Sequence, residues 1–508
     1  MKKFIYPYIL IFTALVGLQS CELEYDPTDQ ITPEKLVNMP GGLQNIANGN
    51  YSMLKDVLTF NGVQNQNYSY MRQYFFLTEF ASDNVTCGQV TTDPFYLSFS
   101  RQLTPSQENT SYFWYVSYKI ISATNTIINV YERGELAQKT PANLQLVGEN
   151  YFMRAFAHFN LLNLFAKQYA VDPDADGIVI RSSDEEPTLK ARSSVKEVYN
   201  FILDDLKKAS SLMAPGTMRG KAYASNWAAK ALLSRVYLYM NEPDSVLKYA
   251  GEVIENGPYS IEADYPNYFR NAPTSLETIW CVQYTIADDL KKFGSIASMY
   301  YSDGNSGWGE EYASDSYREL VEEFLEDTRN QYVVPLSDGM GGVQQKTGTG
   351  IKIYYVSKFS FQDGSPTLSS PAMLRISEIY LNRAEANALK GNNALALDDL
   401  DAIREKRGLS GAALYDGVVP GGMTLLETVL KERRLELAFE GHRTFDLYRH
   451  KLDLNRSYWG YHLPGLKESD VDYTKPAPEN IVSWSDPRNI YYIPEYETRI
   501  NTLCKQNP

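Results

Sequence analysis

Apolar residues recur at three- and four-residue spacing along much of the chain, the pattern of amphipathic helices. This spacing predicts helices over residues 112–130, 146–165 and 195–212. The third helix would begin directly after Ser194, whose side chain can cap a helix start. One face of the first helix carries Trp114, Tyr118, Ile121, Asn125 and Ile128. The chain is therefore predicted to be mainly α.

Two later stretches, 226–256 and 372–407, look like one repeated unit. Each combines a helix, a short turn and a second helix. Helical pairs of about 34 residues are typical of tetratricopeptide repeats. Small side chains stand where paired helices must approach closely, namely Ala228, Ala229, Ala231, Ala384, Ala386 and Ala388. We therefore expect a tetratricopeptide-like scaffold of helical pairs.

Helical spacing is lost over residues 257–371, where Gly, Ser, Tyr and Asp become frequent, and again after Tyr448. Residues 278–284 alternate like a short strand, so a few short strands are expected. Long irregular loops on a rigid scaffold are where binding sites usually lie. We expect the functional site to be built from these loops.

The first twenty residues have the pattern of a secretory signal. Two lysines precede an apolar run over residues 4–18, and a small residue, Ser20, stands before Cys21. The run is too short for a helix that spans a membrane, which needs ~20 apolar residues. Residues 1–20 are therefore predicted to be a signal peptide.

The end of this segment resembles a bacterial lipobox, Leu18-Gln19-Ser20-Cys21. The resemblance implies that Cys21 is lipidated and that residues 21–40 form a polar tether to the membrane. Alternatively, Cys21 is an ordinary thiol beside a soluble cleavage site. The acidic residues 22–26 resemble the signal that sends some lipoproteins to the cell surface, although a solvated tether would have the same composition.

The net charge is −14 over 508 residues, and removal of residues 1–20 takes away two lysines and no acid, which leaves −16. A strongly acidic surface repels phosphate backbones, so we expect no nucleic-acid partner. Besides Cys21 the chain has Cys87, Cys281 and Cys504, enough for one disulfide at most. The protein is therefore not a scaffold held together by disulfides.

One long segment, residues 431–447, has the sequence KERRLELAFEGHRTFDL. It closely follows the signature of a known family, and four other segments match that family in order: residues 79–84, 152–156, 374–386 and 493–508. Together these segments resemble the SusD/RagB family of outer-membrane nutrient-binding lipoproteins.

The resemblance implies one structural unit in which an N-terminal part, residues 41–225, packs on a C-terminal part, residues 226–508. It implies a surface-exposed lipoprotein of the outer membrane that binds oligosaccharides or polysaccharides. The ligand would pass to a SusC-like TonB-dependent transporter, without catalysis and without a cofactor. Capture of peptides is an alternative within the family. A surface glycoside hydrolase and a repeat scaffold that binds only protein are alternatives from other classes.

The signature segment also has a physical interpretation of its own. Thr424 and Glu427 have capping-box spacing, and Gly441 would end the helix. Glu432, Glu436 and Glu440 stack four residues apart and would repel one another. They are either an acid–base pair for glycoside cleavage or part of an ion network that locks the helix to its neighbours. We favour the network, because nearby arginines would keep the acids ionised. The nearest in sequence are Arg433, Arg434 and Arg443.

The family's glycan site, where known, is a shallow surface cluster of aromatic rings, and the resemblance implies candidates here. Trp308 lies in a glycine-rich loop, residues 304–309, that could present its ring to solvent. Asp83 and Asn84 could accept sugar hydroxyls, or Asn84 could hold a turn. Each ring could instead belong to the core or to a transporter contact. The other ring candidates are Phe95, Tyr96, Tyr300, Tyr301 and Tyr312.

The stretch Asp172-Pro173-Asp174-Ala175-Asp176-Gly177 resembles the first half of a calcium-binding loop, with oxygens at alternate positions. Ser183 stands where such a loop has its closing glutamate. A structural calcium on Asp172, Asp174 and Asp176 is one interpretation, and an acidic surface turn is the other. The chain has four histidines and contains no HExxH, GxSxG or P-loop motif.

Overall fold

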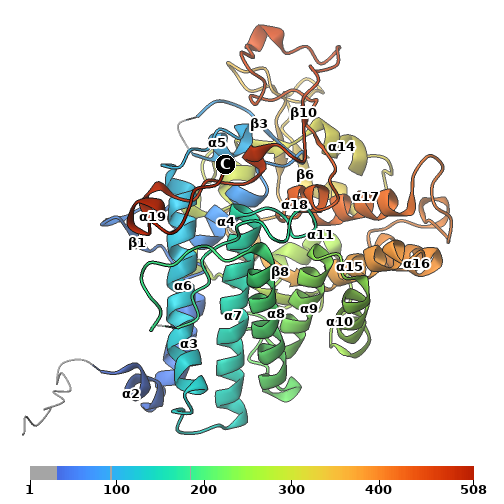
Figure 1. The fold of residues 1–508 in the computed structure, drawn as a ribbon. Helices are drawn as coiled ribbons and strands as arrows, with labels where there is room; N and C mark the ends of the chain where they lie inside the picture. Colours follow the sequence, from blue (N-terminus) through green and yellow to red (C-terminus); the bar gives the residue numbers. More distant parts are fainter. Residues whose placement is uncertain (1–30, 92–93, 184) are drawn as a thin grey trace, which may run out of the picture.

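Long helices form where the sequence repeats its apolar residues every three or four positions. The computed structural model describes residues 31–91, 94–183 and 185–508, so the predicted signal peptide and Cys21 lie outside the described residues. The helices α6 (Glu108–Glu132), α7 (Pro141–Phe165) and α8 (Val195–Leu212) stand side by side, each packed on the next (Figure 1). All three predicted helices are confirmed.

The helix starts follow the capping chemistry of the sequence. Ser194 and Glu197 form a capping box at the first turn of α8, as predicted. The helix α7 begins five residues earlier than predicted, because the Oγ1 of Thr140 accepts the N–H of Asn143 at 3.2 Å and Pro141 fits the first helical position. The spacing of apolar residues does not reveal the first turn of α7, because the signals that start this turn are the capping residue and the proline.

The two predicted helical pairs are α9 (Asn226–Tyr239) with α10 (Pro243–Asn256), and α15 (Ile376–Leu389) with α16 (Asn393–Lys406). Each of the four helices has 14 residues. Both turns contain a residue with positive φ, Asn241 at 60° and Gly391 at 76°. The pairs pack on each other through α10 and α15, which confirms a scaffold of repeated helical pairs.

The start of the second repeat differs from the prediction. Ala372–Arg375 is a strand, β8, that pairs antiparallel with β4, Thr278–Cys281. The strand predicted at 278–284 is thus confirmed in its first half. Residues 372–375 are too few for periodicity to separate a strand from a helical turn, and here the partner strand decides.

Most of the remaining elements are short, and many lie between or after the pairs. The described residues contain five antiparallel two-stranded sheets: β1–β2, β3–β5, β4–β8, β6–β7 and β9–β10. The other strands are β1 (Thr59–Phe60), β2 (Val63–Gln64), β3 (Val85–Cys87), β5 (Glu311–Ala313), β6 (Val333–Pro335), β7 (Tyr354–Val356), β9 (Leu454–Asn455) and β10 (Ile481–Val482). The other α-helices are α2 (Pro33–Asn38), α3 (Gly42–Ser52), α4 (Tyr70–Thr78), α5 (Pro94–Ser100), α11 (Tyr265–Tyr268), α12 (Lys291–Gly294), α13 (Ala297–Tyr300), α14 (Asp315–Val321), α17 (Leu425–Leu437), α18 (Arg443–Tyr448) and α19 (Glu495–Ile500).

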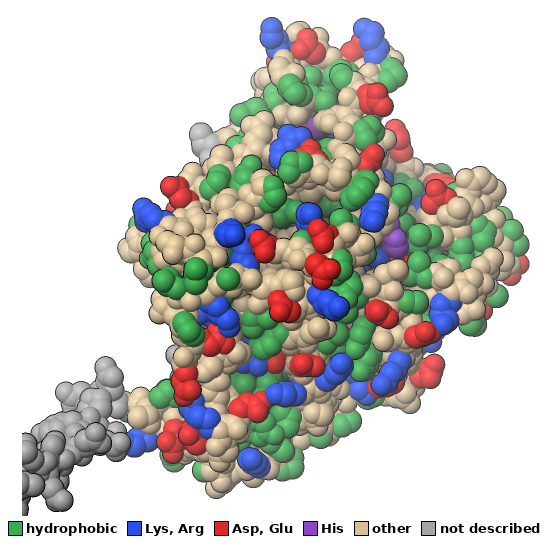
Figure 2. Space-filling model, viewed as in Figure 1, with side chains coloured by type: hydrophobic (Ala, Val, Ile, Leu, Met, Phe, Trp, Pro, Cys, Tyr) green, Lys and Arg blue, Asp and Glu red, His purple; other side chains and the backbone are tan. Residues whose placement is uncertain are grey.

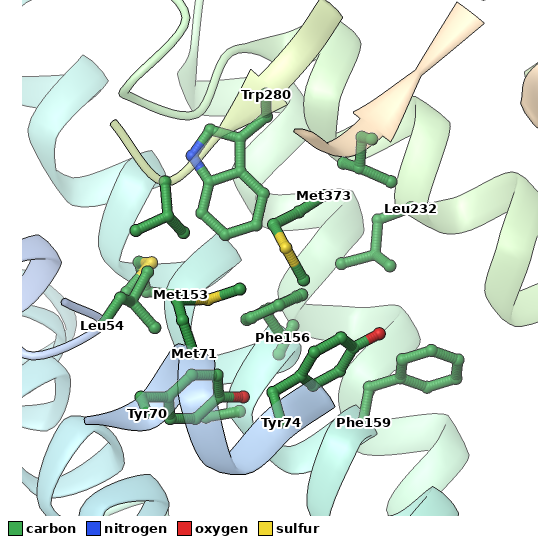
Figure 3. Packing of buried hydrophobic residues seen from close by; sticks show 14 of the residues in the cluster. Leu54, Tyr70, Met71, Tyr74, Met153, Phe156, Phe159, Leu232, Trp280 and Met373 are labelled. Carbon is green, nitrogen blue, oxygen red and sulfur yellow. The ribbon is translucent and has the colours of Figure 1, made fainter. Parts of the chain in front are cut away.

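One hydrophobic core joins residues from both ends of the chain, from Val37 to Cys504. In this core the indole of Trp280 meets the ring of Phe156 edge-on at a centroid distance of 4.9 Å (Figure 3). It meets the ring of Phe152 edge-on at 5.0 Å. These rings come from α7 and β4, so the N-terminal and C-terminal parts share this core.

The predicted tether, residues 21–40, includes a helix, and its first ten residues lie outside the described residues. The helix α2 packs on the fold through the buried side chain of Val37, and the amide of Asn38 donates to the carbonyl of Glu135 at 2.9 Å. Residues 33–40 therefore belong to the folded unit. None of the helices in the described part of the chain combines the length and apolar character needed to cross a bilayer.

Candidate functional site

The loop that carries Trp308 is fixed by local hydrogen bonds. The carboxylate of Asp303 accepts the N–H groups of Asn305 at 2.9 Å and Ser306 at 2.7 Å, a turn stabilised by the side chain. These two N–H groups lower the pKa of Asp303. The carbonyl of Ser298, in α13, accepts the N–H of Trp308 at 2.7 Å. The indole of Trp308 therefore projects from a backbone that these hydrogen bonds hold in place.

A glycine of the same loop is required by close packing. A Cβ at Gly307 would lie 2.0 Å from the carbonyl oxygen of Tyr301, which no side chain can tolerate. The glycine-rich composition thus lets the loop fold back on its own start and present the next residue, Trp308.

Trp308 and Phe293 form an exposed pair of rings, which we call the Trp308 platform. Their side chains are 40% and 52% exposed, and their centroids lie 5.6 Å apart in an edge-on arrangement. The Nζ of Lys292 lies 4.4 Å from the Trp308 ring centroid, a cation–π contact. Phe293 and Lys292 come from α12, a segment that was predicted only in general terms to belong to the binding loops.

The other predicted rings do not share one surface with Trp308. Tyr300, Tyr312 and Phe95 are buried, with at most 1% of the residue exposed. Tyr300 packs against Phe80, Phe359 and Phe439. In their present positions these three rings can offer no face to a ligand.

Tyr301 and Tyr96 are half-buried. The ring of Tyr301 packs edge-on against Tyr355 and Phe361, at centroid distances of 5.6 and 5.1 Å, and burial raises its pKa. Tyr96 donates its hydroxyl to the carbonyl of Tyr461 at 3.0 Å. Tyr301 follows Tyr300 in sequence but lies outside the core, because the chain leaves α13 between the two residues.

Asp83 and Asn84 are buried inside the fold and bind arginines. Asp83 accepts from the Nε of Arg443 at 2.8 Å, and Asn84 accepts from the Nε of Arg434 at 3.0 Å. Burial disfavours the charge of Asp83, but Arg434 and Arg443 outweigh it and lower its pKa to about 2. The expectation that these side chains face a sugar is therefore replaced by a structural role, joining residues 79–84 to the signature segment.

The glutamates of the signature segment lie in a buried ion network, as predicted, but with other cations. Glu432 pairs with Arg329 at 2.5 Å and Arg404 at 2.7 Å. Glu436 pairs with Arg375 at 2.6 Å and Arg407 at 2.7 Å. Each of these arginines lies at least 28 residues from its glutamate in the sequence, so sequence proximity pointed to the wrong partners.

The third glutamate lies beyond the helix. The helix α17 ends at Leu437, and Phe439 takes a φ of 69°, so Gly441 is not the stop that was predicted. Glu440 pairs with Lys358 at 2.6 Å. Burial opposes ionisation of all three acids, but the neighbouring cations outweigh it and lower their pKa values. Such ionised, enclosed carboxylates are poor general acids.

The arginines that neighbour these acids in sequence have partners elsewhere. Arg433 pairs with Asp446 at 3.0 Å, and Arg434 and Arg443 bind the 83–84 segment described above. The capping box of Thr424 and Glu427 at the start of α17 is confirmed.

The predicted calcium loop does not gather its carboxylates. Asp172 forms an ion pair with Lys167 at 2.9 Å, and the backbone of Asp176 pairs with Ser194. Within the described ranges, no group of three or more His, Cys, Asp or Glu side chains is arranged to hold a metal ion. This arrangement of Asp172, Asp174 and Asp176 favours the acidic surface turn over the calcium site. Cys87, Cys281 and Cys504 are free thiols, all of them buried.

Comparison with known proteins agrees with this architecture. The family model described as SusD family matches residues 285–508, and the one described as starch-binding associating with outer membrane matches residues 32–238. SusD-like protein P2 of Formosa agariphila is 24% identical over 483 residues, which covers 89% of this chain and 91% of that protein. A SusD-like protein of Bacteroides ovatus is 24% identical and covers 74% of this chain and 72% of its own length.

Solved structures have the same fold. A SusD superfamily protein from Bacteroides thetaiotaomicron has a TM-score of 0.78 and 26% identity, covering 94% of this chain and 100% of that one. A SusD-like carbohydrate binding protein from Bacteroides vulgatus has a TM-score of 0.71 and 20% identity, covering 91% and 97%. The class is thus a mainly helical scaffold with repeated helical pairs. The chain belongs to the SusD/RagB family.

Proposed function

We propose that this chain is a lipid-anchored protein of the outer-membrane surface that binds oligosaccharides or polysaccharides on the Trp308 platform. It would deliver them uncleaved to a SusC-like TonB-dependent transporter. The family model described as starch-binding and the solved structure described as carbohydrate binding support the ligand class. The observation that carries the proposal is the exposed Trp308–Phe293 pair on a loop held by its own hydrogen bonds.

Ring stacking fits the chemistry of this platform. An indole face is apolar enough to pack against the C–H face of a sugar, and its edge stays in water. A fixed loop gives affinity without first being ordered by the ligand. The carboxylates of the signature network are enclosed and ionised, which supports capture without bond cleavage.

Replacement of Trp308 with alanine is expected to weaken glycan binding about tenfold or more. Loss of one stacked ring costs on the order of 1–3 kcal/mol, and about 1.4 kcal/mol is a factor of ten. The measurement is affinity electrophoresis in native gels that contain soluble starch, xylan or laminarin. Trp308→Phe should retain part of the retardation.

The matched control is Leu325→Ala, because Leu325 is 86% exposed and lies outside the platform. The free energies of unfolding of both alanine variants should lie within about 0.5 kcal/mol of the wild-type value, as expected for surface positions. Retardation of Trp308→Ala equal to that of wild type would show that the platform is not the site.

A Cys21→Ser variant is expected to lose its membrane anchor, because the thiol is the point at which lipid would be attached. Growth with an alkyne-tagged fatty acid should label the wild type and the Cys504→Ser control, but not Cys21→Ser. The unlabelled variant should move from the outer-membrane fraction to the soluble fraction. Persistent labelling of Cys21→Ser would contradict lipidation at this position.

A further inference from the structure

A second aromatic site lies along the exposed face of α6. Side chains on this face repeat at spacings of three and four residues, so they form one stripe along the helix. They line a groove of about 710 Å³ whose other walls are α19 and the β1–β2 hairpin. Figure 1 shows α19 and β1 beside the upper half of α6. The stripe consists of Ser111, Tyr115, Tyr118, Lys119, Ser122 and Thr126.

The walls of this α6 groove are held in place by contacts with the fold. The N–H of Glu495 donates to the carbonyl of Pro105 at 2.9 Å, and Glu497 accepts from the indole N–H of Trp114 in α6 at 3.4 Å. On the hairpin side, the ring of Phe60 packs at 5.2 Å from Tyr115 and edge-on at 5.7 Å from Tyr112. The groove is therefore preformed, as small-molecule sites usually are.

The groove continues past Tyr118 into a second hollow of about 300 Å³. The two hollows share Tyr118, Ser122 and Glu497, and the second is also lined by Asn125 and Arg181. The hydroxyl of Tyr118 donates to the carbonyl of Val179 at 2.7 Å, which fixes its ring between the two. The combined shape suits an extended chain rather than a single compact ligand.

The lining combines rings with small polar groups. Tyr496 is 61% exposed, and Phe60 and Tyr115 are half-buried. The aliphatic side chains in the lining are those of Ala123 and Pro494, too few for the pockets that a partner helix needs for its apolar anchors. In the larger hollow one lysine and one glutamate balance each other, and in the second hollow Arg181 lies 3.9 Å from Glu186. The net charge of −14 disfavours a nucleic acid.

We propose that the α6 groove is a second carbohydrate-binding site, for an uncharged oligosaccharide chain. Its rings would stack on sugar faces, and Ser111, Ser122 and Thr126 would bind hydroxyl groups. The proposal takes its ligand class from the proposed function but not its location. No residue of the Trp308 platform lines the groove.

Two sites on one chain have a consequence for the length of the ligand. A long polysaccharide that reaches both sites binds its second segment at a high effective concentration, whereas a short oligosaccharide occupies one site at a time. Loss of either site should therefore weaken retention of a long polysaccharide, and loss of both should abolish it.

The test uses the full chain in affinity gels that contain soluble starch, xylan or laminarin. Tyr496→Ala removes the most exposed ring, and Ser122→Trp fills the groove at an exposed position without removing a core contact. Each of these two variants is expected to weaken retardation at least threefold. A double variant that combines either of them with Trp308→Ala should migrate as it does in a gel without polysaccharide. Leu325→Ala is the control. Hydrogen exchange should show slower exchange over residues 108–126 and 494–500 when the polysaccharide is bound.

The outcomes separate the two proposals. Wild-type retardation of both groove variants, or complete loss of binding in Trp308→Ala alone, would overturn the second site and leave the proposed function intact. A wild-type protein that none of the polysaccharides retards would overturn both.

Discussion

Replacement of Arg407 with alanine is expected to destabilise the protein by about 3–5 kcal/mol, the usual cost of removing one partner from a buried ion pair. The variant would leave the carboxylates of Glu436 and Glu277 enclosed and short of a cation. Urea or thermal unfolding followed by circular dichroism measures the loss. The free energy of unfolding of Arg407→Lys should lie between those of the wild type and Arg407→Ala. A lysine keeps the positive charge, but its ammonium cannot reproduce the forked contacts of a guanidinium.

The reason lies in the number of elements that Arg407 joins. Its guanidinium lies 2.7 Å from Glu436 in α17 and 2.9 Å from Glu277 beside β4. It also donates to the carbonyl of Glu262 at 2.8 Å and stacks 3.9 Å above the ring of Tyr265. Burial alone would raise the pKa of Glu436, but Arg407 and Arg375 hold it well below its usual range. Loss of Arg407 removes much of that compensation.

The control for Arg407 is an exposed arginine with an equally short ion pair. Arg488 lies 2.6 Å from Asp486, but its side chain is 58% exposed. Arg488→Ala should cost no more than about 1 kcal/mol, because the guanidinium is largely in water and Asp486 keeps a second cation, Arg101, at 3.7 Å. Equal effects of the two substitutions would mean that the buried network contributes no more than a surface pair.

Replacement of Trp280 with alanine is expected to cost about 3–5 kcal/mol, the range for removal of a large aromatic side chain from a core. Trp280 is fully buried and meets the rings of Phe152 and Phe156 edge-on. Because these residues come from β4 and α7, the cavity would open between the two parts of the chain. Thermal unfolding should show one transition at a lower temperature.

Trp280→Phe tests whether ring packing carries this effect. It keeps an aromatic ring between α7 and β4 and leaves a smaller cavity, so its cost should be well below that of alanine. Trp308→Ala provides a second comparison, since the same residue type is removed from a position that is 40% exposed. A Trp280→Ala variant as stable as Trp308→Ala would contradict the central role of this core contact.

The signature segment shows which structural features a local sequence pattern can predict. The glutamate spacing predicted an ion network, and the capping box of Thr424 and Glu427 placed the start of α17 correctly. The cations were assigned wrongly, because Arg329, Arg375, Arg404 and Arg407 reach the glutamates only after distant segments have packed. The surface charges in Figure 2 are interspersed, and this buried network is invisible there.

The aromatic rings show most clearly what local sequence could not predict, namely which side chains are exposed. Glycine-rich sequence around Trp308 was a local signal of an exposed loop, and its ring is exposed. Tyr300 and Tyr301 are neighbours with the same side chain, yet one is fully buried and the other is half-buried. Their irregular surroundings have no period from which an inward or outward direction could be inferred.

The α6 groove was also hidden in the sequence, although its stripe was present there. The predicted helix face that included Trp114 and Tyr118 contains core positions and groove positions side by side. A hydrophobic period identifies the rings of a helix, but whether they face solvent depends on what covers them. Here α19, from the end of the chain, and β1, from near its beginning, leave that face open as a groove.

The sequence by itself determined the helices, their caps and the repeated helical pairs, because these depend on residues a few positions apart. It also determined the family, because the signature segment and the other matching segments occur in the order typical of that family. Tertiary structure alone decided which rings are exposed, which cations neutralise the signature glutamates and whether acidic side chains gather around a metal. Each of these depends on contacts between residues tens to hundreds of positions apart, whose distance in space no local pattern records.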